Sequence, residues 1–532
     1  MSTGLQGLDF SSSPAASAFA AAGLRPCNPG APAPATVRIA AGSSQVPKEG
    51  GSSFVSHVGL AAVSVAALAA TRSAQGRRRG SRASAKAVVE KVVEEVAHAG
   101  AHALDHTHAV QARAETSLLN NYGKRSLAFT HGEGSWLYDV DGRKFLDMTA
   151  GIAVNCLGHS DPGWVETVAR EAGRLCHTSN LYLNPHQVAL GEKLIEISFA
   201  DKAFFCNSGT EANEAAIKFA RKFHYAAGKP REKLIAFENA FHGRTMGALA
   251  LTYKQAYKTP FEPILGNTEF LRFNDPSSLG VIDEETCAVF VEPMQGEGGV
   301  IPASKEFMVA LRKRCDEVGA ILVFDEVQCG LGRTGHLFGY ELTGVIPDLL
   351  TLAKPLAGGL PIGAVLLTEK VAACINPGDH GSTFAGAPLV CAAGNYTVGR
   401  ISEPAFLDHV KEMGERLRAG LWRIAEPRGL EVRGEGLLVG LVFATAEECG
   451  AVKTAAEELF LLVLTAGAGN VMRIAPALTV TAEDLDEALR RLEAAFASYG
   501  RADVDWLQGP GCNCSTACQT DCALWKKKAA SA

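Results

Sequence analysis

The stretch that decides the fold is residues 321–363, ILVFDEVQCGLGRTGHLFGYELTGVIPDLLTLAKPLAGGLPIG. It opens with the apolar run ILVF, which ends on the acidic pair Asp325 and Glu326. A short apolar run bounded by polar residues is typical of a fully buried parallel strand. A second run, LLTLA, ends at Lys354. Open α/β sheets bind ligands at the carboxyl ends of their strands, so the pattern predicts that Asp325 and Lys354 share one site.

A carboxylate and an amine at neighbouring strand ends suit one cofactor, pyridoxal 5′-phosphate. Asp325 would keep the pyridine nitrogen protonated, and Lys354 would bind the aldehyde as a Schiff base. For either residue alone, a capping carboxylate or a solvated surface amine is the more common finding, because charged side chains are mostly exposed. The prediction therefore depends on the two residues together and needs support from elsewhere in the chain.

The same stretch contains a competing motif. Gly330, Gly332 and Gly335 spell G-x-G-x-x-G, the pattern of a dinucleotide-binding turn. That motif requires an amphipathic helix that opens directly on the glycines, whereas here Pro347 interrupts the following segment. We therefore reject a dinucleotide site.

Composition and charge narrow the class of protein. The chain has 532 residues, 47% of them hydrophobic and 20% charged, which is ordinary for a soluble globular protein of roughly two or three domains. A formal net charge of −6 leaves no basic excess to neutralise phosphates, which argues against nucleic acid as a partner. The 14 cysteines show no disulfide-like spacing in the body of the chain, so we expect reduced thiols in an intracellular compartment.

The first 86 residues differ in composition from the rest. They are rich in Ala, Ser, Gly and Pro, contain only Asp9 and Glu49 as acids, and gather arginines near their end. Basic, hydroxylated and acid-poor segments are typical of transit peptides. The apolar run 55–70 is too short and too alanine-rich for a permanent span, so we expect no membrane association in the mature form. Because this signal-like run precedes the basic stretch, we favour import into a plastid over a mitochondrion; a merely disordered N-terminus is the alternative.

Downstream, strand-like and helix-like patterns alternate, which predicts a mostly parallel sheet covered by helices. The short apolar run 203–206 leads into Ser208, Gly209 and Thr210 at the start of an amphipathic helix. Free backbone N–H groups and the helix dipole at such a start suit a phosphate, although an ordinary serine cap explains the same pattern.

The ends of the chain frame this core. A helical pattern runs from 87 to 108, and we expect the folded part to begin near Ser117. The last residues contain C-x-C-x₃-C-x₃-C, a spacing that matches no standard zinc site, so we expect no metal and a regulatory or structural tail. The predicted organisation is a leader at 1–86, a helical linker at 87–116, an N-terminal segment of the small domain at 117–175, a large cofactor-binding domain at 176–387, a small C-terminal domain at 388–500 and a cysteine-rich tail at 501–532.

Many motifs together carry a family resemblance. They are LYDVDGRKFLDMTAGIAVNCLGH, HTSNLYLNP, NSGTEANEAAIKFAR, FENAFHGRTMGALA, VEPMQGEGGV, FDEVQCGLGRTG, LAKPLAGGLPIGA, HGSTFAGAPLVCAA and MRIAP. The chain resembles the class III pyridoxal phosphate aminotransferases over roughly 118–499. The resemblance implies the α/β fold of type I transferases dependent on pyridoxal phosphate, in which a large, mostly parallel sheet domain covered by helices is joined to a smaller α+β C-terminal domain.

The resemblance also implies roles for individual residues. Lys354 would bind the cofactor and move the reacting proton, and Asp325 would pair with the pyridine nitrogen. Phe241 would stack on the ring, Gln328 would reach its hydroxyl, and Thr383 would hold the phosphate of the neighbouring subunit's cofactor, which implies a homodimer with a shared site. The full set of implied cofactor contacts is Ser208, Gly209, Thr210, Phe241, Asp325, Glu326, Val327, Gln328, Lys354 and Thr383.

Four further residues are implied in substrate binding. Arg244 would clamp a substrate carboxylate with its planar fork. Arg473 would receive the α-carboxylate of 2-oxoglutarate, and Glu297 would pair with Arg473 while the amino donor is bound. Ser382 would lie near the amino donor.

Within the family the motifs look most like the acetylornithine branch. This implies transfer of the δ-amino group of N2-acetylornithine to 2-oxoglutarate, which yields glutamate and serves arginine biosynthesis. Ornithine, succinylornithine and 4-aminobutyrate aminotransferases are alternatives in the same class. A glutamate-1-semialdehyde aminomutase is disfavoured because Arg244 and Arg473 provide for two carboxylates. A non-catalytic binding protein of the same fold is the alternative from another class, and the intact Lys354, Asp325 and Arg244 argue against it.

Overall fold

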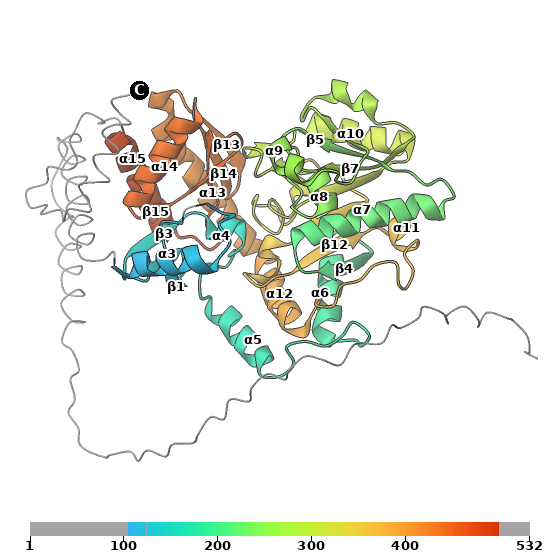
Figure 1. Ribbon diagram of the computed structural model, residues 1–532, viewed down its shortest axis with the longest axis horizontal. Coiled ribbons are helices and arrows are strands. Elements are labelled where there is room, and N and C mark those ends of the chain that lie inside the picture. The colour runs from blue at the N-terminus through green and yellow to red at the C-terminus, as the bar shows by residue number, and fades with distance from the viewer. Residues whose placement is uncertain (1–104, 124, 500–532) are drawn as a thin grey trace, which may run out of the picture. The chain divides into compact units, whose positions relative to one another are not determined.

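The computed structural model describes residues 105–123 and 125–499 (Figure 1). The predicted leader at 1–86, most of the predicted linker and the cysteine-rich tail lie outside the described residues. Within the described part of the chain, no helix is both long enough and apolar enough to cross a bilayer.

A seven-stranded sheet forms the centre of the described fold. Its strand order is β4-β12-β11-β10-β7-β5-β6, and all neighbouring pairs are parallel except those that β12 makes with β11 and β4. The predicted mostly parallel sheet is therefore confirmed, with one antiparallel strand inside it. The strands are β4 (Lys202–Cys206), β5 (Lys233–Phe237), β6 (Thr268–Leu271), β7 (Thr286–Val291), β10 (Ile321–Asp325), β11 (Leu349–Leu352) and β12 (Gly363–Leu367).

Side-chain alternation along β10 explains why helices cover both faces of the sheet. Ile321 and Val323 pack in the cluster that contains α7 (Gly209–Ala226), whereas Leu322 and Phe324 pack in the cluster that contains α10 (Lys305–Val318). Successive strand residues point to opposite faces, so a strand buried on both sides reads as an unbroken apolar run. Figure 1 shows α7 and α10 on opposite sides of the sheet.

Three more helices pack together beside this sheet. Helix α12 (Pro388–Ile401) packs against α5 (Pro162–Ala172) and α6 (Pro185–Glu196). Both α5 and α6 begin with proline and are capped by the preceding side chain, Asp161 and Asn184, each of which accepts a backbone N–H of the first turn. These caps and the prolines at the first helical position explain where the two helices begin.

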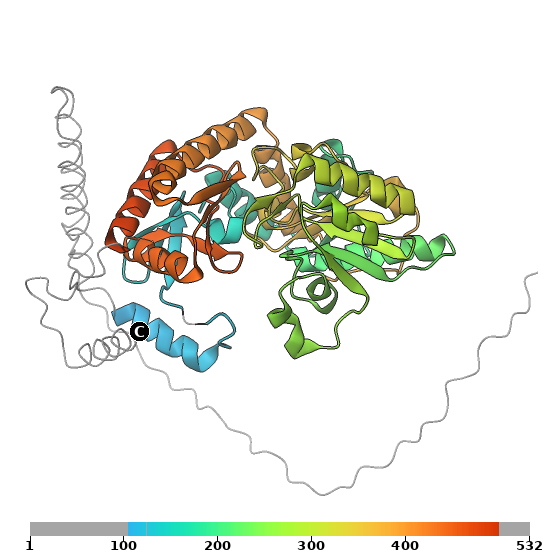
Figure 2. The ribbon, with the colours of Figure 1, turned by 90° about the horizontal axis from the view of Figure 1, so that it is seen from above.

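A smaller antiparallel sheet follows in the C-terminal part, with order β13-β14-β17-β16. The segment after Ala387 forms two helices, because Pro404 starts the second one and donates no N–H to a continuing helix. The C-terminal helices α13 and α15 lie side by side (Figures 1 and 2). The elements are α13 (Pro404–Ala425), β13 (Glu431–Glu435), β14 (Leu438–Val442), α14 (Ala446–Glu458), β16 (Leu464–Ala466), β17 (Val471–Ile474) and α15 (Ala482–Tyr499).

The N-terminal segment joins the C-terminal part through a third sheet. Strands β1 (Phe129–Glu133), β2 (Trp136–Asp139) and β3 (Lys144–Asp147) pair in antiparallel fashion, and β15 (Leu461–Leu462) adds to β3 in parallel. Gly142 lies in the turn between β2 and β3 with a φ of 80°, which glycine adopts without strain.

The N-terminal boundary differs from the prediction. Helix α3 (Asp105–Ser117) continues to residue 117, and Thr107 is buried. The backbone N–H groups of His106 and Thr107 both donate to the carboxylate of Asp141 at 3.3 Å. Because this cap comes from the distant β2–β3 turn, the helical pattern of the segment alone did not reveal it.

Short elements complete the described chain. They are α4 (Ala150–Ala153), α8 (Met246–Ala250), α9 (Gln255–Lys258), η1 (Thr259–Phe261), η2 (Pro276–Val281), β8 (Met294–Gln295), β9 (Ile301–Pro302), η3 (Gly339–Leu342), η4 (Lys354–Ala357), α11 (Glu369–Ala372) and η5 (Glu426–Arg428). No helix opens on the glycines of 330–335, which agrees with the rejection of a dinucleotide site.

Candidate active site

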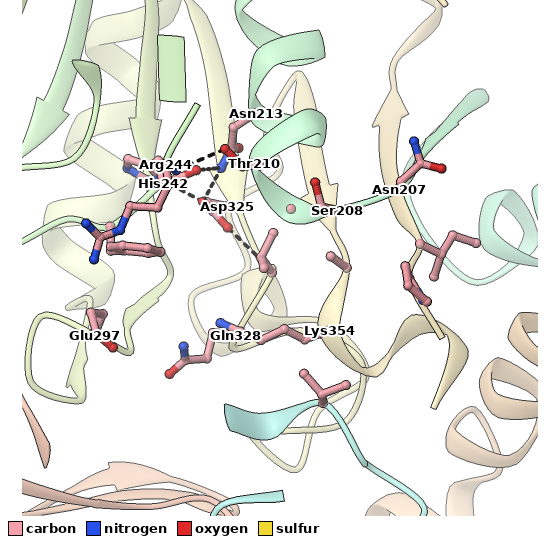
Figure 3. Close-up of a pocket in the computed structure, with 18 of the residues that line it drawn as sticks. Asn207, Ser208, Thr210, Asn213, His242, Arg244, Glu297, Asp325, Gln328 and Lys354 are labelled. Atoms are coloured by element: carbon pink, nitrogen blue, oxygen red, sulfur yellow. Dashed lines mark hydrogen bonds and ion pairs between the residues drawn. The ribbon is translucent and has the colours of Figure 1, made fainter. Parts of the chain in front are cut away.

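A cavity of about 370 Å³ opens at the carboxyl end of β10. This volume is in the range of small-molecule sites. The cavity walls come from the start of α7, the segment after β5, the segments after β7 and β10, and the segment around η4 (Figure 3). Ten of the predicted site residues line it, namely Ser208, Gly209, Thr210, Phe241, Arg244, Glu297, Asp325, Val327, Gln328 and Lys354.

Asp325 is the most firmly held of these residues. One carboxylate oxygen, Oδ2, accepts from His242 Nδ1 and from Asn213 Nδ2, both at 2.7 Å, and Oδ1 accepts from the backbone N–H of Val327 at 3.0 Å. Asn213 is in turn fixed by Thr351, whose hydroxyl donates to Asn213 Oδ1 at 3.0 Å. Figure 3 shows Asn213 and His242 joined to Asp325 by hydrogen bonds.

His242 provides a positive partner for this buried carboxylate. Burial acts to lower the pKa of His242, but the hydrogen bond and the charge of Asp325 outweigh it, and the pKa is raised. The raised pKa favours the protonated imidazole, which donates to the Asp325 carboxylate in a charge-assisted hydrogen bond. Sequence reasoning missed His242 and Asn213, although His242 directly follows the predicted stacking residue Phe241.

Lys354 follows β11 at the other side of the cavity. Burial lowers the pKa of the Lys354 amine to about 8, and the nearby Arg473 charge acts in the same direction. The carboxylates of Asp325, Glu292 and Glu297 oppose the shift. An amine that is partly neutral near physiological pH can act as a nucleophile and as a proton carrier.

The start of α7 presents backbone donors to the cavity. Ser208 is the N-cap of this helix, and its hydroxyl accepts from the backbone N–H of Glu211 at 3.3 Å, so the ordinary serine cap is present. Within residues 105–123 and 125–499, no backbone carbonyl accepts from the N–H of Gly209 or Thr210. A Cβ on Gly209 would lie 2.7 Å from Val327 Cγ1, so glycine allows the helix start to approach this wall closely. Two free donors at a helix N-terminus suit an anionic group.

Arg244 lies at the wall that carries Phe241. Its guanidinium is 3.5 Å from the ring centroid of Tyr257 and 5.6 Å from that of Phe241. The Thr210 hydroxyl accepts from the backbone N–H of Arg244 at 3.2 Å, which ties this loop to the start of α7. The aromatic support holds the planar group while leaving its N–H edges available for a carboxylate.

Arg473 reaches the same region from β17 of the C-terminal sheet. It is buried, and its Nη1 donates to Glu297 Oε2 at 2.9 Å and to Gln328 Oε1 at 3.0 Å. The pairing of Glu297 with Arg473 that the resemblance implied is therefore present. Gln328, whose predicted partner was a ring hydroxyl, uses its carbonyl oxygen for Arg473, and its amide nitrogen donates to no acceptor among residues 105–123 and 125–499.

Besides Arg473, three predicted residues lie outside the cavity lining. Glu326 accepts from the backbone N–H groups of Gly339 and Tyr340 at 2.6 and 2.7 Å, and burial raises its pKa to about 8. Because successive residues of an extended segment point to opposite sides, the Glu326 side chain points away from the side that Asp325 faces. It therefore holds the 339–342 turn, and the predicted contact with the cofactor is not seen. Ser382 accepts from Asn207 Nδ2 at 2.8 Å, and Thr383 is exposed and does not line the cavity of its own chain.

The fold is shared with a known enzyme family. The family model described as aminotransferase class-III matches residues 119–496, and the chain belongs to that family. Among the described residues there is no cluster of His, Cys, Asp and Glu suited to a metal ion.

Relatives named as aminotransferases match most of the chain. The mitochondrial acetylornithine aminotransferase of Alnus glutinosa is 49% identical over 387 residues, which cover 71% of this chain and 85% of the relative. The acetylornithine aminotransferase of Rhodobacter capsulatus is 46% identical over 387 residues, which cover 72% and 98% of the two chains. The crystal structure of N-acetylornithine aminotransferase from Stenotrophomonas maltophilia K279a matches with a TM-score of 0.63 at 37% identity, over 71% of this chain and 98% of the other. The crystal structure of ornithine aminotransferase from Toxoplasma gondii ME49 matches with a TM-score of 0.70 at 30% identity, over 73% of this chain and 94% of the other.

Proposed function

We propose that this enzyme transfers the δ-amino group of N2-acetylornithine to 2-oxoglutarate, with pyridoxal 5′-phosphate as cofactor and glutamate as product, in arginine biosynthesis. The observation that carries the proposal is the contact between Arg473 and Glu297 in a pocket that also contains Arg244. A site that alternates between a donor with a single carboxylate and a dicarboxylate needs one arginine whose charge can be covered and uncovered. The names of the relatives at 46 to 49% identity support the acetylornithine branch.

The residues present fit this cofactor. The free N–H groups of Gly209 and Thr210 would hold its phosphate, Asp325 would hold the ring nitrogen, and Phe241 would cover the ring. Gln328 would donate its free amide nitrogen to the ring hydroxyl. When bound, the cofactor supplies an electron sink for the carbon that carries the amino group.

The side chains of the protein then have separate tasks. Lys354, with the pKa of its free amine lowered to about 8, can take a proton from the reacting carbon and return it. His242 donates to Asp325 at 2.7 Å and so holds in place the carboxylate that would pair with the ring nitrogen. Arg244 orients the donor carboxylate, and Arg473 binds the α-carboxylate of 2-oxoglutarate after Glu297 has moved away.

Sharing of the site between two subunits is part of the proposal. Thr383 is exposed and does not line its own cavity, and its neighbour Ser382 is held by Asn207 at the edge of that cavity. This placement supports a homodimer in which Thr383 reaches the phosphate of the partner's cofactor. Sedimentation of the purified protein, and loss of cofactor from a Thr383→Ala variant, would test it.

The compartment is also proposed from the sequence. Residues 1–86 would direct import into an organelle, with a plastid favoured by the signal-like run before the basic stretch. Relatives from Alnus glutinosa and Dictyostelium discoideum carry the word mitochondrial in their names, so a fluorescent fusion of residues 1–86 must be scored against markers of both organelles.

Steady-state kinetics with a panel of amino donors test the substrate. N2-acetylornithine, ornithine, succinylornithine and 4-aminobutyrate are compared at saturating 2-oxoglutarate. We expect the highest kcat/KM with N2-acetylornithine. A higher kcat/KM with any of the other three donors would assign the enzyme to that branch instead.

A further inference from the structure

Glu292 is a buried carboxylate in the cavity wall to which the proposed chemistry gives no task. It follows β7, is 5% exposed and lines the cavity with Asp325 and Glu297. Its two oxygens accept from two separate segments. Oε1 accepts from the backbone N–H of Phe241 and Oε2 from that of Gly296, both at 3.1 Å.

The two segments that Glu292 joins carry residues of different function. Phe241 lies in the wall that would cover the cofactor ring, and Gly296 directly precedes Glu297, which pairs with Arg473. The Gly296 segment has no spare room, because a Cβ on Gly296 would lie 2.0 Å from Gln328 Oε1. A small displacement of this segment would therefore move Glu297 relative to Arg473.

A carboxylate suits this position better than its amide. Both Glu292 partners are backbone donors, and a carboxylate can accept on both oxygens. A glutamine has one oxygen, so its NH₂ group would face one of the two N–H donors and that hydrogen bond would be lost. The substitution keeps the shape of the side chain and removes the bridge between the two segments.

We propose that Glu292 is a positioning residue that joins the Phe241 wall to the Glu297 loop and thereby sets how firmly Glu297 covers Arg473. The proposal rests on the proposed roles of Glu297 and Arg473. It predicts that the dicarboxylate site and the cofactor site respond together when Glu292 is changed, although Glu292 contacts neither charged group of the Glu297–Arg473 pair by a hydrogen bond among the described residues.

The test uses the holoenzyme and two binding measurements. Glutarate, a dicarboxylate without an amino or keto group, reports on Arg473 through its competitive inhibition constant, and the absorbance of the cofactor reports on its rate of release. In Glu292→Gln we expect glutarate to bind ~5-fold more tightly and the cofactor to leave ~5-fold faster, the size expected for loss of one hydrogen bond. Glu292→Asp keeps the charge but shortens the reach, so it serves as a second variant if Glu292→Gln does not fold.

A double substitution separates positioning from a general loss of stability. In a Glu297→Gln background, Glu292→Gln should leave the glutarate constant unchanged while the cofactor still leaves faster. The control is Glu326→Gln, because Glu326 is also buried and accepts two backbone N–H groups, here from Gly339 and Tyr340. It should lower Tm without altering glutarate binding.

Two outcomes overturn the proposal. One is an inhibition constant for glutarate in Glu292→Gln that equals the wild-type value. The other is a change in that constant on Glu292→Gln substitution that is equally large in the wild-type and Glu297→Gln backgrounds. Arg473→Ala is measured in parallel, because glutarate binding that does not depend on Arg473 would refute the proposed function itself and not the role of Glu292.

Discussion

Replacing Glu297 by glutamine removes the carboxylate that covers Arg473. The two groups are 2.9 Å apart, and the Arg473 side chain is only 4% exposed while that of Glu297 is 40% exposed. A pair of charges near a protein surface interacts by ~4 kcal/mol at 4 Å, but exposure of one partner reduces such pairs toward ~1 kcal/mol. An intermediate value of about 1.4 kcal/mol corresponds to a tenfold change in a binding constant.

The expected result is therefore a shift in the balance between the two halves of the reaction. Because the arginine no longer has to leave a charged partner, glutarate should inhibit Glu297→Gln at ~10-fold lower concentration, and the half-reaction with glutamate should gain on that with N2-acetylornithine. Stopped-flow absorbance of each half-reaction measures the balance directly. If glutarate binds no more tightly to the variant than to the wild type, Glu297 does not compete for Arg473 and the switching account is wrong.

Further substitutions test the other parts of the site. Arg244→Lys keeps the charge but loses the planar fork stacked on Tyr257, so KM for the amino donor should rise ~10-fold in steady-state assays. Arg473→Ala should instead impair chiefly the half-reaction with 2-oxoglutarate. Equal impairment of both half-reactions by both variants would contradict this division of roles. In the cofactor-free protein the pKa of Lys354 is lowered to about 8, so its amine is neutral and reactive above that pH. The rate of acylation of Lys354, followed by peptide mapping, should therefore rise with pH with a midpoint near 8. In Arg473→Ala the repelling charge is gone, so the midpoint should shift to higher pH. Gly243 has a φ of 137°, and a Cβ there would lie 2.2 Å from Thr210 Oγ1. Gly243→Ala should therefore lower the free energy of unfolding by about 1–3 kcal/mol, measured by thermal unfolding. An unchanged Tm would show that the loop can move aside.

The meeting of Asp325 and Lys354 in one cavity could be predicted because it depends on local pattern. An apolar run that ends in a charge determines both a buried strand and the edge at which the charge lies, so Asp325 and Lys354 follow from β10 and β11 without knowledge of the rest. The start of α7 follows in the same way from a short strand and a helix cap. These features require only neighbours in sequence.

Contacts between distant segments could not be predicted in this way. The hydrogen bonds that hold Asp325 come from His242 and Asn213, and the bridge made by Glu292 depends on the packing of two loops against each other. Arg333 is a further example, because its fully buried guanidinium donates to the backbone carbonyls of Leu437 and Pro476. In the sequence it is one residue of a glycine-rich run, and nothing local marks it as a tie between the segment after β10 and the C-terminal part.

The most direct test of the account is to find which side chain carries the cofactor. The holoenzyme is reduced with borohydride, which fixes the cofactor to the amine that holds it, and the digested protein is analysed by mass spectrometry. The account predicts one modified peptide, with the adduct on Lys354, and none in Lys354→Ala, whose activity should fall by at least the ~10²- to 10⁴-fold expected for loss of a positioned acid–base group. An adduct on another lysine, or an adduct that persists in Lys354→Ala, would contradict it.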